Sequence, residues 1–123
     1  MADRPHRVFI VDDDFLIVEY LRDAVEDLGL TVAGTAATAD DAIRLVREAR
    51  PDVVLMDVRL RGHSDGVDAA RSIHADLNVP IIFITGSNEP QTLERIGKDS
   101  PRAVLIKPIT PDQLQTVLRD MLD

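Results

Sequence analysis

Four short apolar runs constrain the fold of this chain more strongly than any other feature of its sequence. They are Val8–Val11, Val53–Met56, Ile81–Ile84 and Val104–Ile106. None alternates apolar with polar residues, so we expect them to be buried on both faces. Continuous runs of this kind, rich in β-branched residues, are typical of a parallel sheet covered by helices. A weaker fifth strand fits residues Thr31–Ala36.

Segments with the apolar period of a helix lie between these runs, and each ends at a helix-breaking residue. Gly29 follows the first segment, Pro51 the second and Pro80 the third. Thr110 and Pro111 suit the cap and first turn of a last helix. The alternation predicts an α/β fold of the flavodoxin-like, doubly wound type, with a five-stranded parallel sheet in the order 2-1-3-4-5 and five helices.

Polar residues stand directly after the predicted strands. They are Asp12, Asp13 and Asp14 after the first strand, Asp57 after the third, Thr85 after the fourth and Lys107 after the fifth. Ligands of such sheets bind outside the carboxyl ends of the strands, which for this strand order means between the first and third. We therefore expect the chemistry of this protein at that edge, with Asp14 serving only as the N-cap of the first helix.

Carboxylates crowded at one edge would repel each other and have raised pKa values unless a cation joined them. Oxygen ligands without a nearby His or Cys favour Mg²⁺, with Mn²⁺ as the alternative. A carboxylate can also attack phosphorus and form an acyl phosphate. Lys107 and Thr85 would then supply a positive charge and a hydroxyl donor to the transferred group. The pattern predicts metal-assisted phosphoryl transfer without a separate base.

These strand-end motifs resemble the response-regulator receiver family of two-component signalling over the full chain. The matching segments are Val11–Asp14, Met56–Leu60, Thr85–Gly86 and Ile106–Thr110. The resemblance implies that Asp57 accepts a phosphoryl group from a histidine kinase or a histidine phosphotransfer protein. It implies that Lys107 and Thr85 contact the phosphoryl oxygens and that the Lys107–Pro108 peptide is cis. It also implies an Mg²⁺ site made by Asp12, Asp13, Asp57 and the backbone carbonyl of Arg59.

A receiver of this kind would work as a module rather than as an enzyme, catalysing only its own phosphorylation and dephosphorylation. We expect a single domain over residues 1–123 with no output domain, acting as a monomer or weak dimer on a downstream protein target. The family's usual contact surface is formed by the fourth helix, fifth strand and fifth helix, where Ile109 and the neighbourhood of Pro90 are the candidates.

The sequence departs from the family where many receivers carry Tyr or Phe, three residues before the lysine. Val104 occupies that position, which puts the usual threonine-aromatic switch in doubt. Residues 88–100 offer only Leu93 and Ile96 as large apolar side chains, so we hypothesise a short or mobile fourth helix that becomes ordered on phosphorylation. Arg59 and Ser87 occupy the family positions that tune the lifetime of the phosphoryl group.

Composition excludes several other classes of function. The chain has no cysteine, which removes disulfides and thiolate chemistry, and its net charge of -8 disfavours direct binding to nucleic acid. No apolar run approaches the roughly 20 residues of a membrane span, and the N-terminus lacks a signal-type stretch, so we expect no membrane contact and a cytoplasmic location.

Two alternative functions remain open at this stage. One is a receiver-like interaction module that is never phosphorylated. The other is a small Mg²⁺-dependent phosphatase on a similar sheet. Haloacid-dehalogenase-like phosphatases place Asp-x-Asp after a strand, whereas Asp57 is followed two residues later by Arg59.

Overall fold

The sheet of this protein is parallel throughout and has the predicted strand order. The computed structural model describes residues 6–86, 90–98 and 101–122; the predicted tuning residue Ser87 lies outside them. In sheet order the strands are β2 (Thr31–Ala36), β1 (Arg7–Val11), β3 (Val53–Asp57), β4 (Ile81–Thr85) and β5 (Ala103–Ile106). Every pair of neighbours is parallel, which confirms the predicted topology.

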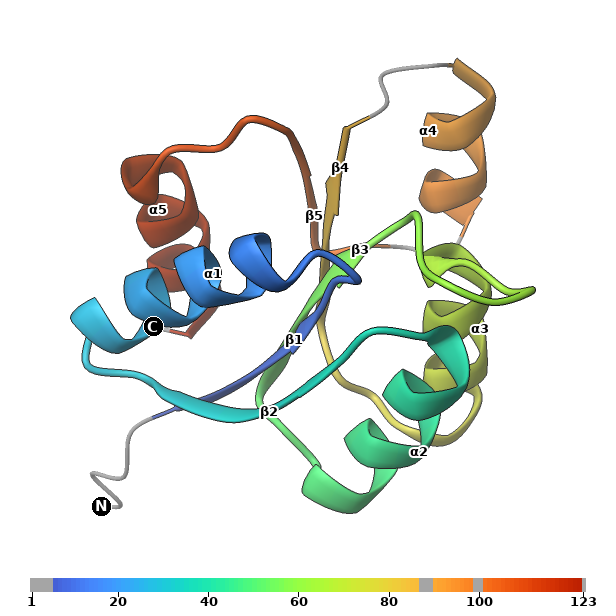
Figure 1. The fold of residues 1–123 in the computed structure, drawn as a ribbon, viewed down its shortest axis with the longest axis horizontal. Helices are drawn as coiled ribbons and strands as arrows, with labels where there is room; N and C mark the ends of the chain where they lie inside the picture. The colour runs from blue at the N-terminus through green and yellow to red at the C-terminus, as the bar shows by residue number, and fades with distance from the viewer. Residues whose placement is uncertain (1–5, 87–89, 99–100, 123) are drawn as a thin grey trace.

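In the described part of the chain, five helices cover the two faces of the sheet, so that β3 and β4 are fully buried and β1 is buried from Val8 onward. Figure 1 shows the helices divided between the two faces, and the residues of the two apolar cores assign each helix to its face. One face carries α1 (Phe15–Asp27) and α5 (Pro111–Leu122), and the other carries α2 (Ala39–Ala49), α3 (Gly66–Asp76) and α4 (Pro90–Lys98). Each face has its own apolar core, one centred on Phe9 and Phe83 and the other on Ile10 and Leu55.

The helices begin and end where the sequence signals predicted. Asp14 caps α1, because its carboxylate accepts hydrogen bonds from the backbone N–H groups of Leu16 (2.9 Å) and Ile17 (3.4 Å). Gly29 follows α1 with a φ of 80°, a conformation that glycine adopts readily. The Thr110 hydroxyl caps α5 by accepting from the Gln113 backbone N–H at 3.1 Å. These local signals fix how the chain enters and leaves each helix.

The expectation that β5 is buried on both faces is wrong. β5 is the outer strand of the sheet, and its residues are half-buried or exposed, with Ile106 39% exposed. The physical reason is that an outer strand has a neighbour on one side only. An apolar run therefore predicts a strand but not its place in the sheet.

No helix within the described residues has the length and apolar character needed to cross a membrane.

Candidate functional site

The register of the parallel strands brings the predicted site residues to one edge of the sheet. Val11 of β1 pairs with Met56 of β3, so the next residues, Asp12 and Asp57, lie side by side. At the other side of β3, Asp57 itself pairs with Ile84 of β4. Asp57 therefore stands between the ends of β1 and β4, at the point where the strand order reverses.

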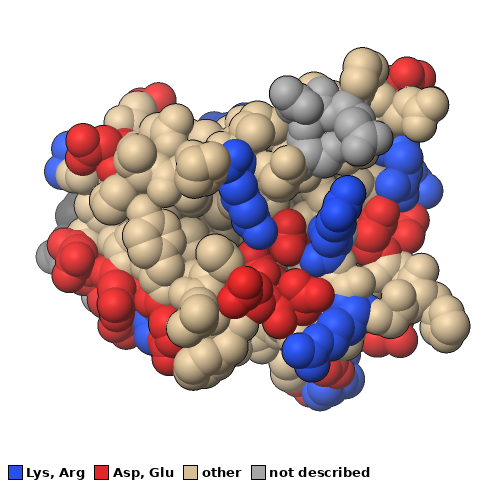
Figure 2. All heavy atoms as spheres, turned by 45° about the horizontal axis from the view of Figure 1, so that its top comes forward, with Lys and Arg blue, Asp and Glu red and all other residues tan. Residues whose placement is uncertain are grey.

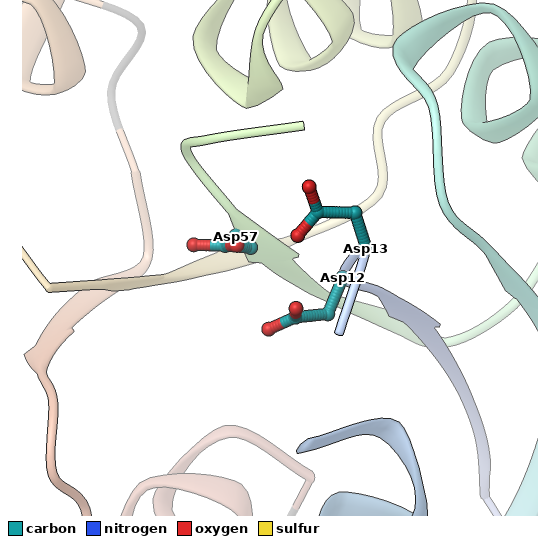
Figure 3. A group of neighbouring side chains, drawn as sticks. All are labelled: Asp12, Asp13 and Asp57. Carbon is teal, nitrogen blue, oxygen red and sulfur yellow. The ribbon is translucent and has the colours of Figure 1, made fainter. Parts of the chain in front are cut away.

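Three carboxyl groups meet at this edge. Figure 3 shows Asp12 and Asp13, which follow β1, next to Asp57 at the end of β3. One oxygen from each carboxyl group lies within 4.8 Å of those from the other two. Asp12 and Asp57 are buried, 2% and 6% exposed, whereas Asp13 is half-buried. The Asp14 backbone N–H donates to Asp12 Oδ1 at 2.9 Å and so orients that carboxylate.

The ionised form of Asp57 is disfavoured by its surroundings. Burial, and after it the neighbouring Asp12 carboxylate, raises the pKa of Asp57 from 3.8 to about 6, although Lys107 partly offsets these effects. A carboxylate with a pKa below 7 is still mainly ionised at neutral pH. Asp57 thus carries a negative charge that the folded protein compensates only in part.

Lys107 supplies the positive charge of the site. Its Nζ lies 3.2 Å from Asp12 Oδ2 and 3.4 Å from Asp57 Oδ1. Burial opposes the charge of the ammonium group, but the Asp57 and Asp12 carboxylates outweigh burial and raise the pKa of Lys107. Lys107 therefore stays protonated and bridges the two buried carboxylates.

The backbone around Lys107 has the predicted conformation. The Lys107–Pro108 peptide is cis, as the family resemblance implied. The Lys107 backbone N–H donates to the Thr85 carbonyl at 2.8 Å, which joins the ends of β4 and β5.

Thr85 is buried, and its side chain points to the same face of the sheet as Phe83, because side chains alternate along a strand. Val104 packs against the core of that face. Arg59 is exposed in the segment that follows β3. The structure thus brings together Asp12, Asp13, Asp57 and Lys107 and places Thr85 at the adjoining strand end, while the roles of Thr85, Val104 and the Arg59 carbonyl stay predictions.

The sequence analysis missed Gly66, which begins α3. A Cβ added to Gly66 would lie 2.0 Å from the Asp57 carbonyl oxygen. The Gly66 backbone N–H donates to the Val58 carbonyl at 2.7 Å, which closes the segment after β3. A glycine at the first turn of a predicted helix, directly after a potential cap at Asp65, was the available signal.

The sequence analysis also missed a charged contact between α3 and α4. The Arg95 guanidinium donates to both carboxylate oxygens of Asp65, at 2.8 and 3.3 Å, and lies 3.5 Å from Asp68 Oδ1. Burial works against ionisation of Asp65, but hydrogen bonds from Arg95 and from the Asp68 backbone outweigh it and lower the pKa of Asp65. No sequence spacing predicts this pair, because its partners lie 30 residues apart.

The chemistry of the donor set fits a hard divalent cation. Three carboxylates converge within one coordination sphere, and they come without a thiolate or imidazole that would favour a softer metal. The face drawn in Figure 2 carries a group of acidic side chains with Lys and Arg side chains on both sides of it. Such an arrangement can hold a small cation and also attract an anionic group.

Comparison with known proteins gives a consistent family assignment. The sequence model described as "Response regulator receiver domain" matches residues 8–119. The phyllosphere-induced regulator PhyR of Methylorubrum extorquens is 32% identical over 98% of this chain and 45% of its own length. The transcriptional regulatory protein PdtaR of Mycobacterium tuberculosis is 32% identical over 89% of this chain and 53% of its own. The chain spans about half the length of these curated relatives.

Solved structures show the same fold. The signal receiver domain of a modulated diguanylate cyclase from Desulfovibrio desulfuricans G20 is 36% identical, with a TM-score of 0.90 over 96% of this chain and 94% of that one. The receiver domain of PhyR from Erythrobacter litoralis is 34% identical, with a TM-score of 0.85 over 97% of this chain and 91% of that one. These similarities extend over nearly the whole chain.

Proposed function

Because this chain belongs to the family of response regulator receiver domains, we propose that it accepts a phosphoryl group on Asp57 and passes the signal to another protein. The observation that carries the proposal is the placement of the buried Asp57 carboxylate against both Lys107 and the Asp12–Asp13 pair. A buried aspartate with this set of partners has the charge to attack phosphorus and the neighbours to stabilise the product.

In the proposed reaction, a carboxylate oxygen of Asp57 forms a new bond to phosphorus while the bond from phosphorus to the donor breaks. With a phosphohistidine donor, the imidazole nitrogen leaves with the electron pair of the P–N bond. Lys107 stands next to Asp57 Oδ1 and stabilises the added negative charge. Thr85 supplies a hydroxyl donor from the neighbouring strand end. Asp57 is ionised at neutral pH, so the step needs no separate base.

We propose that Asp12, Asp13, Asp57 and the backbone carbonyl of Arg59 hold Mg²⁺. The ion would neutralise charge on the phosphoryl oxygens and on the crowded carboxylates. The raised pKa of Asp57 fits this assignment, because burial and after it the Asp12 carboxylate disfavour the ionised form, and a bound cation would offset both effects.

The proposed donor is a histidine kinase or a histidine phosphotransfer protein in the cytoplasm, and the proposed recipient is a downstream protein target. The site chemistry is the same whether the protein regulates a target directly or relays phosphate, because only the contact surface differs. The covalent change is confined to the protein's own Asp57, which distinguishes this function from turnover of external phosphoesters.

The test is intact-protein mass after incubation with Mg²⁺ and acetyl phosphate. We expect wild type to gain one base-labile phosphoryl group and Asp57→Asn to gain none. A Mg²⁺-free sample is the matched control for the metal. No adduct on wild type with any donor would contradict the proposal and favour a phosphorylation-independent interaction module, and catalytic release of phosphate from external esters would favour a phosphatase.

A further inference from the structure

The position of the Lys107 ammonium group depends on the short segment that carries it. This segment, residues 107–110, joins β5 to α5. A lysine side chain has a long flexible stem, so its charge is placed well only when the backbone beneath it is fixed. On the β5 side, the Lys107 backbone N–H is fixed to the Thr85 carbonyl at 2.8 Å. The backbone that follows Lys107 needs a separate hydrogen bond to fix it.

Tyr20 of α1 provides that hydrogen bond. Its hydroxyl donates to the Ile109 carbonyl at 2.9 Å, across 89 residues of sequence. Pro108, between Lys107 and Ile109, has no backbone N–H to donate. The Tyr20 side chain and Lys107 also line the same groove, together with Pro108 and Ile109. The hydroxyl therefore contacts the segment two residues beyond Lys107.

The contact closes a ring of interactions around the site. Asp14 caps α1 and its backbone N–H holds Asp12 Oδ1 at 2.9 Å. Tyr20, further along α1, holds Ile109, and Lys107 returns to Asp12 Oδ2 at 3.2 Å. One helix thus positions the acidic side of the site through its first turn and the basic side through Tyr20.

We infer that Tyr20 is a positioning residue for phosphoryl transfer: its hydroxyl holds the Ile109 carbonyl and so keeps the Lys107 ammonium group directed at Asp57. The inference rests on the proposed function, in which Lys107 stabilises the transferred group. Among the described residues, the Tyr20 hydroxyl bonds to the Ile109 carbonyl and to none of the site carboxylates, so its effect on transfer passes through the segment that carries Lys107.

The test is Tyr20→Phe, which removes the hydroxyl and keeps the ring. At saturating Mg²⁺ we expect phosphorylation by acetyl phosphate to slow by about 3- to 10-fold, the range for loss of one hydrogen bond. Mg²⁺ affinity is measured in parallel by calorimetry, because Lys107 also contacts the proposed metal ligands Asp12 and Asp57, and saturating Mg²⁺ keeps any change in affinity out of the measured rate. Asp76→Asn is the matched control, because it breaks an ion pair with Arg47 between α2 and the end of α3 and should leave the rate unchanged.

A double-mutant cycle with Lys107→Ala separates positioning from general stability. If Tyr20 acts through Lys107, adding Tyr20→Phe to Lys107→Ala slows phosphorylation no further. An equal loss in both backgrounds, or an unchanged rate for Tyr20→Phe alone, would overturn the inference while the proposed function stands. Wild type that takes no phosphoryl group would overturn both.

Discussion

Helices α3 and α4 lie on the same face of the sheet and follow neighbouring strands of the site, yet they are attached to it in different ways (Figure 1). α3 starts at a reciprocal capping box between Asp65 and Asp68 and buries five residues along its length. α4 has nine described residues, and Ile96 is the buried one among them. Both contain a glycine, but Gly66 of α3 packs on Asp57 whereas Gly97 of α4 has open space beside it.

This difference predicts which of the two helices would change when Asp57 is phosphorylated. Gly66 of α3 packs against the backbone of Asp57 and donates to the Val58 carbonyl, so we expect a movement of α3 to disturb the site. α4 is held by one buried apolar side chain and by the pair that Arg95 forms with Asp65 and Asp68. An element with few buried contacts opens at low cost, so we expect α4 to respond more readily than α3 to phosphorylation of Asp57. The Arg95 pair is a direct link from α4 to the residues that precede and begin α3, after the end of β3.

The largest expected difference is between the effects of alanine at Gly66 and at Gly97 on the free energy of unfolding. Gly66→Ala would place a Cβ 2.0 Å from the Asp57 carbonyl oxygen, so backbone must shift. We expect it to lower the free energy of unfolding by about 3 kcal/mol. Gly97→Ala meets nothing within 4 Å and removes a flexible residue from a helix, so we expect a gain of about 0.5–1 kcal/mol. Urea unfolding followed by circular dichroism measures both changes.

The same pair of variants has a second readout at the site. Gly66→Ala should also weaken Mg²⁺ binding, because the shifted backbone belongs to Asp57, whereas Gly97→Ala should leave it unchanged. Equal effects of the two substitutions on stability would contradict the contrast between a fixed α3 and a loosely attached α4.

Much of this arrangement is predictable from sequence, because it depends on local pattern. Buried strands on both faces produce continuous apolar runs, and parallel strands carry their carboxyl ends to one edge. Asp12, Asp13, Asp57 and Lys107 therefore came together as expected. Asp14 and Thr110 were recognisable as caps because a cap acts on backbone only a few residues away.

The parts that sequence did not predict are contacts between elements far apart in the chain. Arg95 meets Asp65, and Tyr20 meets Ile109, only after the helices have packed on the sheet. The outer position of β5 likewise depends on the order of strands and not on its own composition. Gly66 belongs with these, since the need for glycine arises from the approach of the Asp57 carbonyl.

The pKa values of Asp57 and Asp65 are shifted in opposite directions, and this difference gives the second prediction. The pKa of Asp65 is lowered by its partners, whereas burial and Asp12 raise that of Asp57 to about 6. The folded protein therefore binds a proton at Asp57 more tightly than the unfolded chain does, and stability falls as pH rises from about 4 to about 6. Asp57→Asn removes this penalty, so without Mg²⁺ we expect it to be more stable than wild type at pH 7.5 by about 2 kcal/mol.

Denaturant unfolding at two pH values checks the sign of the stability difference between Asp57→Asn and wild type. At pH 4 wild-type Asp57 is already protonated, so the advantage of Asp57→Asn should shrink, and Lys107 retains Asp12 as its partner in both proteins. Added Mg²⁺ should stabilise wild type in preference to the variant. A variant that is less stable than wild type at pH 7.5 without Mg²⁺ would show that Asp57 is compensated by the protein alone.

The smallest expected effect concerns the Arg95 pair itself. Arg95→Gln removes the charge that links α4 to Asp65, and because the pair is partly exposed we expect a loss of at most about 1 kcal/mol. Hydrogen exchange should show faster exchange in α4 and unchanged exchange in α3. Lys98→Gln is the matched control, since Lys98 pairs with Glu94 inside α4 at 3.7 Å and this pair does not join α4 to another element.

Hydrogen exchange of the same variants after phosphorylation tests whether the Arg95 pair couples α4 to Asp57. If α4 becomes ordered when Asp57 is phosphorylated, wild type gains exchange protection in α4 on treatment with acetyl phosphate and Mg²⁺. Lys98→Gln should gain as much, and Arg95→Gln should gain less, because the link from α4 to the start of α3 is cut. Equal protection of wild-type α4 with and without phosphate would instead place the response in another element. If the protection of α3 also stays constant, α3 is excluded as that element.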